Sequence, residues 1–172
     1  FKTSKHLIPL FKNSEFESVT FLSDAVDESE EFDFQVSLLA LPEKLKISKT
    51  DDVSYKDKYL TATKEKVELY KKKFFDNDYT KVGIVWSGMP GHINDKNRSV
   101  SLSLFYDLAK IKNVKLYSLQ KGYGEEQLSD IPKDIEIIGV GNTFNDFSDT
   151  AAAIENCDYV VSVDTAVAHL GG

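Results

Sequence analysis

The segment 162–169, SVDTAVAH, combines residues that could bind a phosphorylated ligand. An apolar strand ends at Asp164 and Thr165, and a helix begins there. The first N–H groups of a helix have no partner within it and carry a partial positive charge, which suits a pyrophosphate. Thr165 adds a hydroxyl donor, Asp164 could accept from ribose hydroxyls, and His169 shares a helix face with Thr165. The alternative is structural, with Asp or Thr as an ordinary helix cap and His169 in the core.

A second candidate is the loop 86–99, WSGMPGHINDKNRS, which follows another apolar strand. Gly88 and Gly91 allow the backbone to approach a ligand closely. Arg98 is the best cation in the loop for a diphosphate, because its planar guanidinium can bind two oxygens at once. The alternative is a surface loop with solvated charges.

A third strand-end loop, SLQKG, places Gln120 and Lys121 where they could meet a base or a phosphate. The stretch 138–146, IGVGNTFND, fails as a dinucleotide fingerprint because Phe144 stands where the third glycine belongs. The three histidines are dispersed, so no metal site is expected. Trp86 at a strand end could stack on a base, although core packing is the commoner role.

The elements that would position these residues alternate between strand and helix from residue 81 onward. Strands are expected at 81–88, 114–120, 135–141 and 159–165, and helices at 101–111, 149–157 and from 166. In helix 101–111 the expected cap is Ser101 or Ser103, and the expected buried face is Leu104, Phe105, Leu108 and Ile111. This alternation predicts an α/β, Rossmann-like parallel sheet with flanking helices, whose ligand lies beyond the carboxyl ends of the strands.

The first 80 residues are less regular. A helix is expected at 4–12, strands at 18–22 and 32–42, a solvated acidic loop at 24–33 and a helix at 57–75. The lysine-rich stretch 56–73 could steer an anionic ligand, or it could simply be a solvated helix face.

Composition restricts the class of protein. The chain has 172 residues, 41% of them hydrophobic and 28% charged, as in a soluble globular domain. A net charge of −7 argues against nucleic-acid binding, and no apolar run reaches the roughly 20 residues of a transmembrane helix. A single cysteine, Cys157, favours a cytoplasmic location and is expected in the core. The chain begins without Met and ends where a helix is under way, so we expect a piece of a longer protein.

Three stretches resemble the C-terminal half of a known family: KVGIVWSGMPGHINDKNRS, FYDLAKIKNVKLYSLQKG and FNDFSDTAAAIENCDYVVSVDTAVAHLGG. The family comprises bacterial GT-B glycosyltransferases akin to ADP-heptose heptosyltransferases, which are often linked to tetratricopeptide repeats. The resemblance implies that 81–172 is an incomplete nucleotide-sugar-binding domain. It also implies that 1–45 is a remnant of the N-terminal, acceptor-side domain, joined by a linker and helix at 46–80.

The resemblance also implies roles for single residues. Asp164 would hold ribose or sugar hydroxyls, and the N–H groups of Thr165 and Ala166 would hold the diphosphate, with His169 beside it. Arg98 would neutralise the leaving diphosphate, so Arg98 and His169 are the expected catalytic residues. Gly88, Gln120 and Lys121 complete the expected donor site. The family has D-T-G where this chain has Ala166, and its loop cation is usually Lys rather than Arg98.

The implied activity is inverting, metal-independent sugar transfer from a nucleotide-diphosphate sugar, with no other cofactor. The acceptor would be a saccharide, a lipid-linked glycan or a protein, and the general base would lie before Phe1. We therefore expect little activity from this chain alone, and self-association through an unfinished sheet.

Three other functions remain open. The first is a GT-B sugar-nucleotide epimerase, which needs no acceptor. The second is a non-catalytic nucleotide- or partner-binding module of a repeat protein. The third, a two-domain NAD-dependent enzyme, is disfavoured by the failed glycine fingerprint at 138–146.

Overall fold

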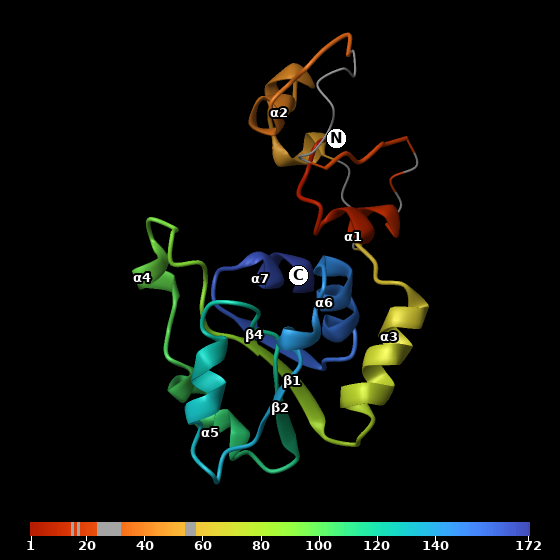
Figure 1. Cartoon of the computed structure of the whole chain (residues 1–172). Helices are drawn as coiled ribbons and strands as arrows, with labels where there is room; N and C mark the ends of the chain where they lie inside the picture. Colours follow the sequence, from red (N-terminus) through yellow and green to blue (C-terminus); the bar gives the residue numbers. More distant parts are fainter. Residues whose placement is uncertain (15, 17, 24–31, 54–57) are drawn as a thin grey trace.

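Four parallel strands in the order β3-β2-β1-β4 form the centre of the molecule (Figure 1). This computed structural model describes residues 1–14, 16, 18–23, 32–53 and 58–172. The strands are β1 (Thr80–Val85), β2 (Val114–Ser118), β3 (Ile137–Gly139) and β4 (Tyr159–Ser162). The predicted α/β fold with an all-parallel sheet is confirmed, and each predicted strand of the regular part is present.

The strand β1 pairs on both sides. The chain adds β2 and β3 on one side of it and then returns to add β4 on the other, so the strand order reverses at β1. Val82 is in register with Leu116 of β2 on one side and with Tyr159 of β4 on the other. Strands β1, β2 and β3 follow one another outward, whereas β4 is added on the far side of β1. In open sheets of this kind the ligand crevice lies at that reversal, beyond the carboxyl ends of the two strands.

The two faces of the sheet carry separate hydrophobic clusters, because side chains alternate along each strand. On one face, Val85 and Tyr117 lie in a cluster with Tyr70, Phe75 and residues of α6. The elements here are α3 (Lys64–Tyr70), a π-helical turn (Lys71–Phe75), α6 (Phe147–Ile154) and α7 (Ala166–Gly171).

On the opposite face, Ile84 and Trp86 pack against Leu102 and Phe105. These two residues belong to a 3-10 turn (Leu102–Phe105) that leads into α5 (Tyr106–Ala109), and a 3-10 segment at Glu125–Asp130 lies beyond β2. Figure 1 shows α5 and α3 on opposite sides of the sheet. Helices on both faces of a parallel sheet define a Rossmann-like fold.

Helix starts in this part follow local capping chemistry. The Asp146 carboxylate accepts from Ser148 N at 2.7 Å, and the Thr63 hydroxyl accepts from Lys66 N at 3.3 Å. Ser101 is the cap at the predicted place, where its hydroxyl accepts from Ser103 N at 3.3 Å. Side-chain acceptors of this type pair the N–H groups that a helix start leaves free.

The predicted buried face of helix 101–111 is partly wrong. Leu102 and Phe105 are buried, whereas Leu104 and Ile111 are exposed. The segment begins as a 3-10 turn with three residues per turn, so positions three apart, rather than three and four apart, share the inner face.

The N-terminal predictions are only partly confirmed. The chain forms α1 (Ile8–Lys12) within the predicted helix, but residue 22 makes an isolated bridge to Lys2 in place of a strand at 18–22. The predicted strand at 32–42 is wrong, since short helices occupy Leu38–Ala40 and Leu41–Lys44 and another lies at Thr50–Asp52. No strand among the described residues pairs with this segment, and Phe34 and Leu39 are 95% and 93% exposed.

Two further expectations touch residues that the structure does not describe. Most of the acidic stretch 24–33 lies outside the described residues. The helix predicted at 57–75 begins only at Lys64, and residues 58–63 are not helical. Within the described residues, no helix is long and apolar enough to cross a membrane.

Candidate functional site

A cavity of about 500 Å³ lies at the carboxyl edge of the sheet. Its walls come from the loops after β1, β2 and β3, from the start of α7 and from the N-terminal segment. Five of the eight predicted donor-site residues line it: Gly88, Gln120, Lys121, Thr165 and Ala166. Most of its surface is apolar and includes Val85, Leu119 and Phe144. An apolar cavity with a few convergent polar groups is the usual form of a small-molecule site.

Gln120 organises the loops around this cavity. Its Oε1 accepts from Trp86 N at 3.1 Å and from Ser87 N at 3.0 Å. Its Nε2 donates to Ser87 O at 2.9 Å and to Tyr123 O at 2.7 Å. The side chain is buried and its amide already holds the loops after β1 and β2 together, so in this structure it supports the site rather than facing a ligand.

The backbone beside Gln120 is equally tight. A Cβ added at Gly141 would come within 1.9 Å of the Gln120 carbonyl oxygen, so only glycine fits there. Gly124 has a φ of +92° and its carbonyl accepts from Trp86 Nε1 at 3.2 Å. Trp86 is therefore a buried core residue and does not offer its ring to a base.

Lys121, Thr165 and Ala166 are the predicted residues best placed to meet an anion. Lys121 is exposed at the cavity and forms no ion pair with any residue that the structure describes. Thr165 is the N-cap of α7, and its hydroxyl lies 3.1 Å from that of Ser162 and does not cap the helix. The first N–H groups of α7 therefore have no side-chain cap and can donate to a ligand. The Thr165 hydroxyl and Lys121 line the same cavity.

Arg98 lies next to the cavity and joins the two loops that flank the reversal point. Its Nη1 donates to the Asp164 carbonyl at 3.0 Å, and its Nε donates to Asp95 Oδ1 at 3.2 Å. Gly88 makes room for it, because a Cβ there would lie 2.6 Å from Arg98 Nη2. The structure brings Arg98 and Asp164 together through the backbone of Asp164, and the role predicted for Arg98 toward a diphosphate stays a prediction.

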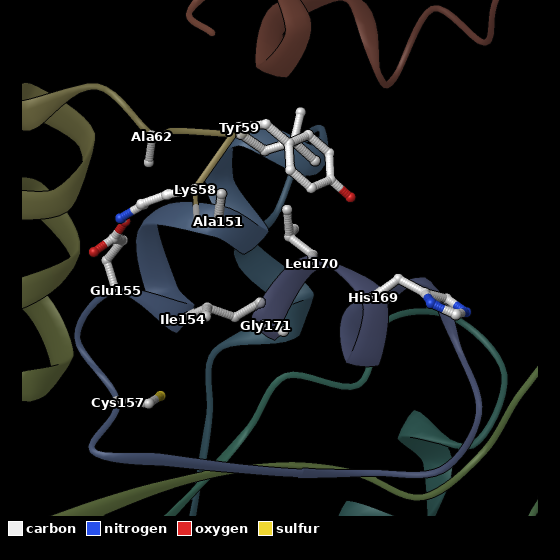
Figure 2. Close-up of a pocket in the computed structure, with 12 residues that line it drawn as sticks. Lys58, Tyr59, Ala62, Ala151, Ile154, Glu155, Cys157, His169, Leu170 and Gly171 are labelled. Atoms are coloured by element: carbon white, nitrogen blue, oxygen red, sulfur yellow. The ribbon is translucent and has the colours of Figure 1, made fainter. Parts of the chain in front are cut away.

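His169 is separated from Thr165 rather than sharing its cavity. It lines a smaller cavity of about 310 Å³, shown in Figure 2, between the 58–62 segment, α6 and the end of α7. There its ring points away from the other labelled side chains, and its Nε2 lies 3.6 Å from Asp164 Oδ1. Both side chains are largely exposed, at 80% and 76%. Their predicted roles therefore stay predictions.

Lys66, which lies in the lysine-rich stretch 56–73, belongs to a network of charged residues with Asp146 and Asp149. Its Nζ donates to Ser148 Oγ and to Asp149 Oδ1, both at 2.6 Å. Burial acts to lower the pKa of Lys66, but the hydrogen bond and charge of Asp149, with the charge of Asp146, outweigh it and raise the pKa. This lysine holds α3 against the start of α6 and is neither a free steering charge nor a solvated face.

Asp146 belongs to the same network and also lines the cavity. Burial acts to raise its pKa, but hydrogen bonds from Ser148 and the charge of Lys66 prevail and lower it. Cys157, in contrast, is half-buried beside the cluster that contains Tyr70 and Val85, and burial raises its thiol pKa to about 12. The prediction that Cys157 is a packing residue agrees with this environment.

The N-terminal segment supplies cavity residues that sequence reasoning missed. Ser4 and His6 line the cavity, and Phe147 N donates to His6 O at 3.0 Å. Nothing local in the sequence signals this contact, since the two segments lie at opposite ends of the chain.

In the described part of the chain, no group of three or more His, Cys, Asp or Glu side chains is arranged to hold a metal ion. Fold and site together define a Rossmann-like α/β protein with a cavity at its strand reversal. A scan of protein-family models and searches of curated proteins and of solved structures gave no match.

Proposed function

We propose that this chain binds the nucleoside-diphosphate part of a sugar donor and forms the donor-binding part of a two-domain GT-B glycosyltransferase. The intact protein would transfer the sugar to a saccharide, a lipid-linked glycan or a protein, with inversion and without a metal. The observation that carries the proposal is the cavity at the strand reversal, where Lys121, Thr165 and Ala166 meet an apolar wall.

The chemistry of the lining suits such a ligand. The exposed side chains of Met89 and Tyr123 offer apolar surface to a base, above a floor of the buried residues Val85, Leu119 and Phe144. Lys121, with the Thr165 hydroxyl and the first N–H groups of α7, offers cationic and neutral donors to a diphosphate. Donors already in place stabilise the charge that develops on the leaving diphosphate as the glycosyl bond breaks.

Arg98 would act from the edge of this site. Its contacts to Asp95 and to the Asp164 carbonyl set the distance between the loops after β1 and β4. Its guanidinium would supply a second positive charge to the departing diphosphate once a donor sugar occupies the crevice.

The proposal is tested by titration calorimetry with ADP, UDP, GDP, CDP and dTDP, and with NAD as a comparison. We expect one nucleoside diphosphate to bind and NAD not to bind. Lys121→Ala should weaken that binding about tenfold or more, because a charge-assisted hydrogen bond is lost. Lys112→Ala removes the same charge at the opposite end of β2 and should leave affinity unchanged.

A second variant addresses the other side of the crevice. The Asp164 carboxylate is largely exposed, so Asp164→Ala should weaken binding with little effect on folding. Absence of binding by every nucleotide, or equal effects of Lys121→Ala and Lys112→Ala, would refute the proposed donor site.

A further inference from the structure

We propose that His6 is the general base of the reaction at this cavity, and the inference rests on the proposed donor site. The family resemblance places the general base before Phe1. The structure instead offers a histidine within the chain, on the wall of the cavity that the N-terminal segment supplies. His6 thus lines the same cavity as the strand-end residues Lys121 and Thr165.

Two hydrogen bonds to the backbone of 145–147 hold His6 in place, one through its ring and one through its own carbonyl. Its Nδ1 lies 3.3 Å from the Asn145 carbonyl oxygen, and its own carbonyl accepts from Phe147 N at 3.0 Å. A carbonyl oxygen can only accept, so Nδ1 carries the hydrogen. In a neutral imidazole the other nitrogen, Nε2, then has the free lone pair.

No residue that the structure describes makes a hydrogen bond to His6 Nε2. The ring is exposed and could take a proton from a bound hydroxyl group. Two charged groups share the cavity with it, Lys121 and Asp146. Asp146 Oδ1 accepts from Ser148 N at 2.7 Å and from Ser148 Oγ at 2.5 Å, and no hydrogen bond joins this carboxylate to His6 among the described residues.

The other two histidines do not share this arrangement. His92 Nδ1 accepts from Asn94 N at 3.2 Å, which requires the opposite neutral tautomer, with the hydrogen on Nε2. His92 lines a different cavity, and His169 lines the cavity of Figure 2. His6 is therefore the histidine that the fold places with the predicted phosphate-binding residues.

The proposed step is balanced. The acceptor hydroxyl oxygen forms a bond to the anomeric carbon of the donor sugar, and the bond from that carbon to the diphosphate oxygen breaks. The diphosphate leaves with the bonding electron pair. The proton of the attacking hydroxyl passes to His6 Nε2 and then to solvent, while the Asn145 carbonyl holds the imidazolium by Nδ1–H.

The tautomer is tested first, by long-range ¹H–¹⁵N correlation spectra of the imidazoles in the full chain at pH 8. We expect hydrogen on Nδ1 for His6 and on Nε2 for His92, which acts as an internal control. Hydrogen on Nε2 of His6 would overturn the proposal.

Turnover is tested with nucleotide sugars that contain the nucleoside diphosphate found to bind. Water is the acceptor, and the released nucleoside diphosphate is measured. His6→Asn keeps an N–H donor for the Asn145 carbonyl but has no base. It should lower kcat about 10²-fold or more and remove the acid limb of the kcat/KM profile, because the group that accepts the proton is lost. Affinity for the diphosphate should change less than threefold, and His92→Asn should leave both unchanged.

The outcomes separate this inference from the proposed function. If no nucleoside diphosphate binds the wild-type chain, the donor site itself is refuted. If one binds but His6→Asn keeps its kcat and its acid limb, only the assignment of His6 is overturned. Binding without release from any matching nucleotide sugar also contradicts the assignment of His6 alone.

Discussion

Replacing Gln120 by leucine should destabilise the protein strongly. The change keeps the approximate volume of the side chain but removes its amide. Trp86 N and Ser87 N then lose their acceptor, and the carbonyls of Ser87 and Tyr123 lose their donor. These groups lie on loops that the amide joins, so no strand pairing replaces the lost bonds.

The magnitude follows from the two backbone N–H groups. A buried donor left without a partner costs about 1–3 kcal/mol. Two such donors give an expected loss of about 2–6 kcal/mol in the free energy of unfolding. That is a large part of the about 5–15 kcal/mol that ordinarily separates folded from unfolded domains.

The assay is urea unfolding followed by the fluorescence of Trp86, whose indole lies beside the affected loops. Gln35→Leu is the matched control, because Gln35 is exposed and should change stability by no more than about 0.5 kcal/mol. A loss below about 1 kcal/mol in Gln120→Leu would refute the reasoning that this amide bridges the two loops.

A second substitution at the same place adds a pH test. Gln120→Glu keeps the shape but turns a carboxylate oxygen toward two carbonyls. Burial and those carbonyls should raise the pKa of this carboxyl in the folded protein above its unfolded value. The variant should therefore be most stable at acidic pH and lose stability as the pH rises through that raised pKa.

Three further predictions concern the surroundings of the site. Gly141→Ala should cost about 3 kcal/mol in urea unfolding, because its Cβ would overlap the Gln120 carbonyl, whereas Gly91→Ala, with nothing within 4 Å, should be neutral. The pKa of Asp146 is lowered in the folded protein, so its ionised carboxylate stabilises the fold at pH values above the ordinary pKa of 3.8. This stabilisation is lost as the pH falls through the lower pKa of the folded state. Asp146→Ala should therefore flatten the acid limb of a stability–pH curve. Cys157, with a pKa raised from 9.0 to about 12, should react with a disulfide reagent at pH 8 about 10³-fold more slowly than in urea-unfolded chain.

Each of these predictions can fail on its own. Equal stabilities of the Gly141 and Gly91 variants would contradict the close backbone approach. An unchanged acid limb in the Asp146 variant would place the acid-sensitive groups elsewhere. Rapid labelling of Cys157 in the native protein would show that burial does not raise the pKa of its thiol as described.

The regular part of the fold could be predicted because its physical signals are local. Val82 to Val85 form a continuous buried run, and Ser101 caps its helix with its own side chain, whereas the helix predicted at 149–157 begins earlier, at Phe147 after the cap Asp146. The segments 18–22 and 32–42 carry similar apolar residues but form no strand. The prediction failed there because an apolar run does not reveal whether a partner strand lies beside it.

The candidate site could be predicted as a place but not in its details. Strand ends in a parallel sheet meet at one edge, which brought Gly88, Lys121 and Thr165 together. The direction of the Gln120 side chain depends on the backbone of two other loops. The position of His6 depends on a contact to Asn145 across 139 residues. Neither contact leaves a pattern in the neighbouring sequence.

The central place of β1 constrains the order in which the chain can fold during synthesis. β1 can pair with β2 once residue 118 has left the ribosome, but its other edge stays unpaired until 159–162 emerge. Parallel pairing between distant segments is slow, and an open edge of Val82–Val85 is a template for contacts with other chains. The strand that creates the crevice is thus also the one exposed longest in the nascent protein, so changes that delay β4 should reduce yield before they affect the finished fold.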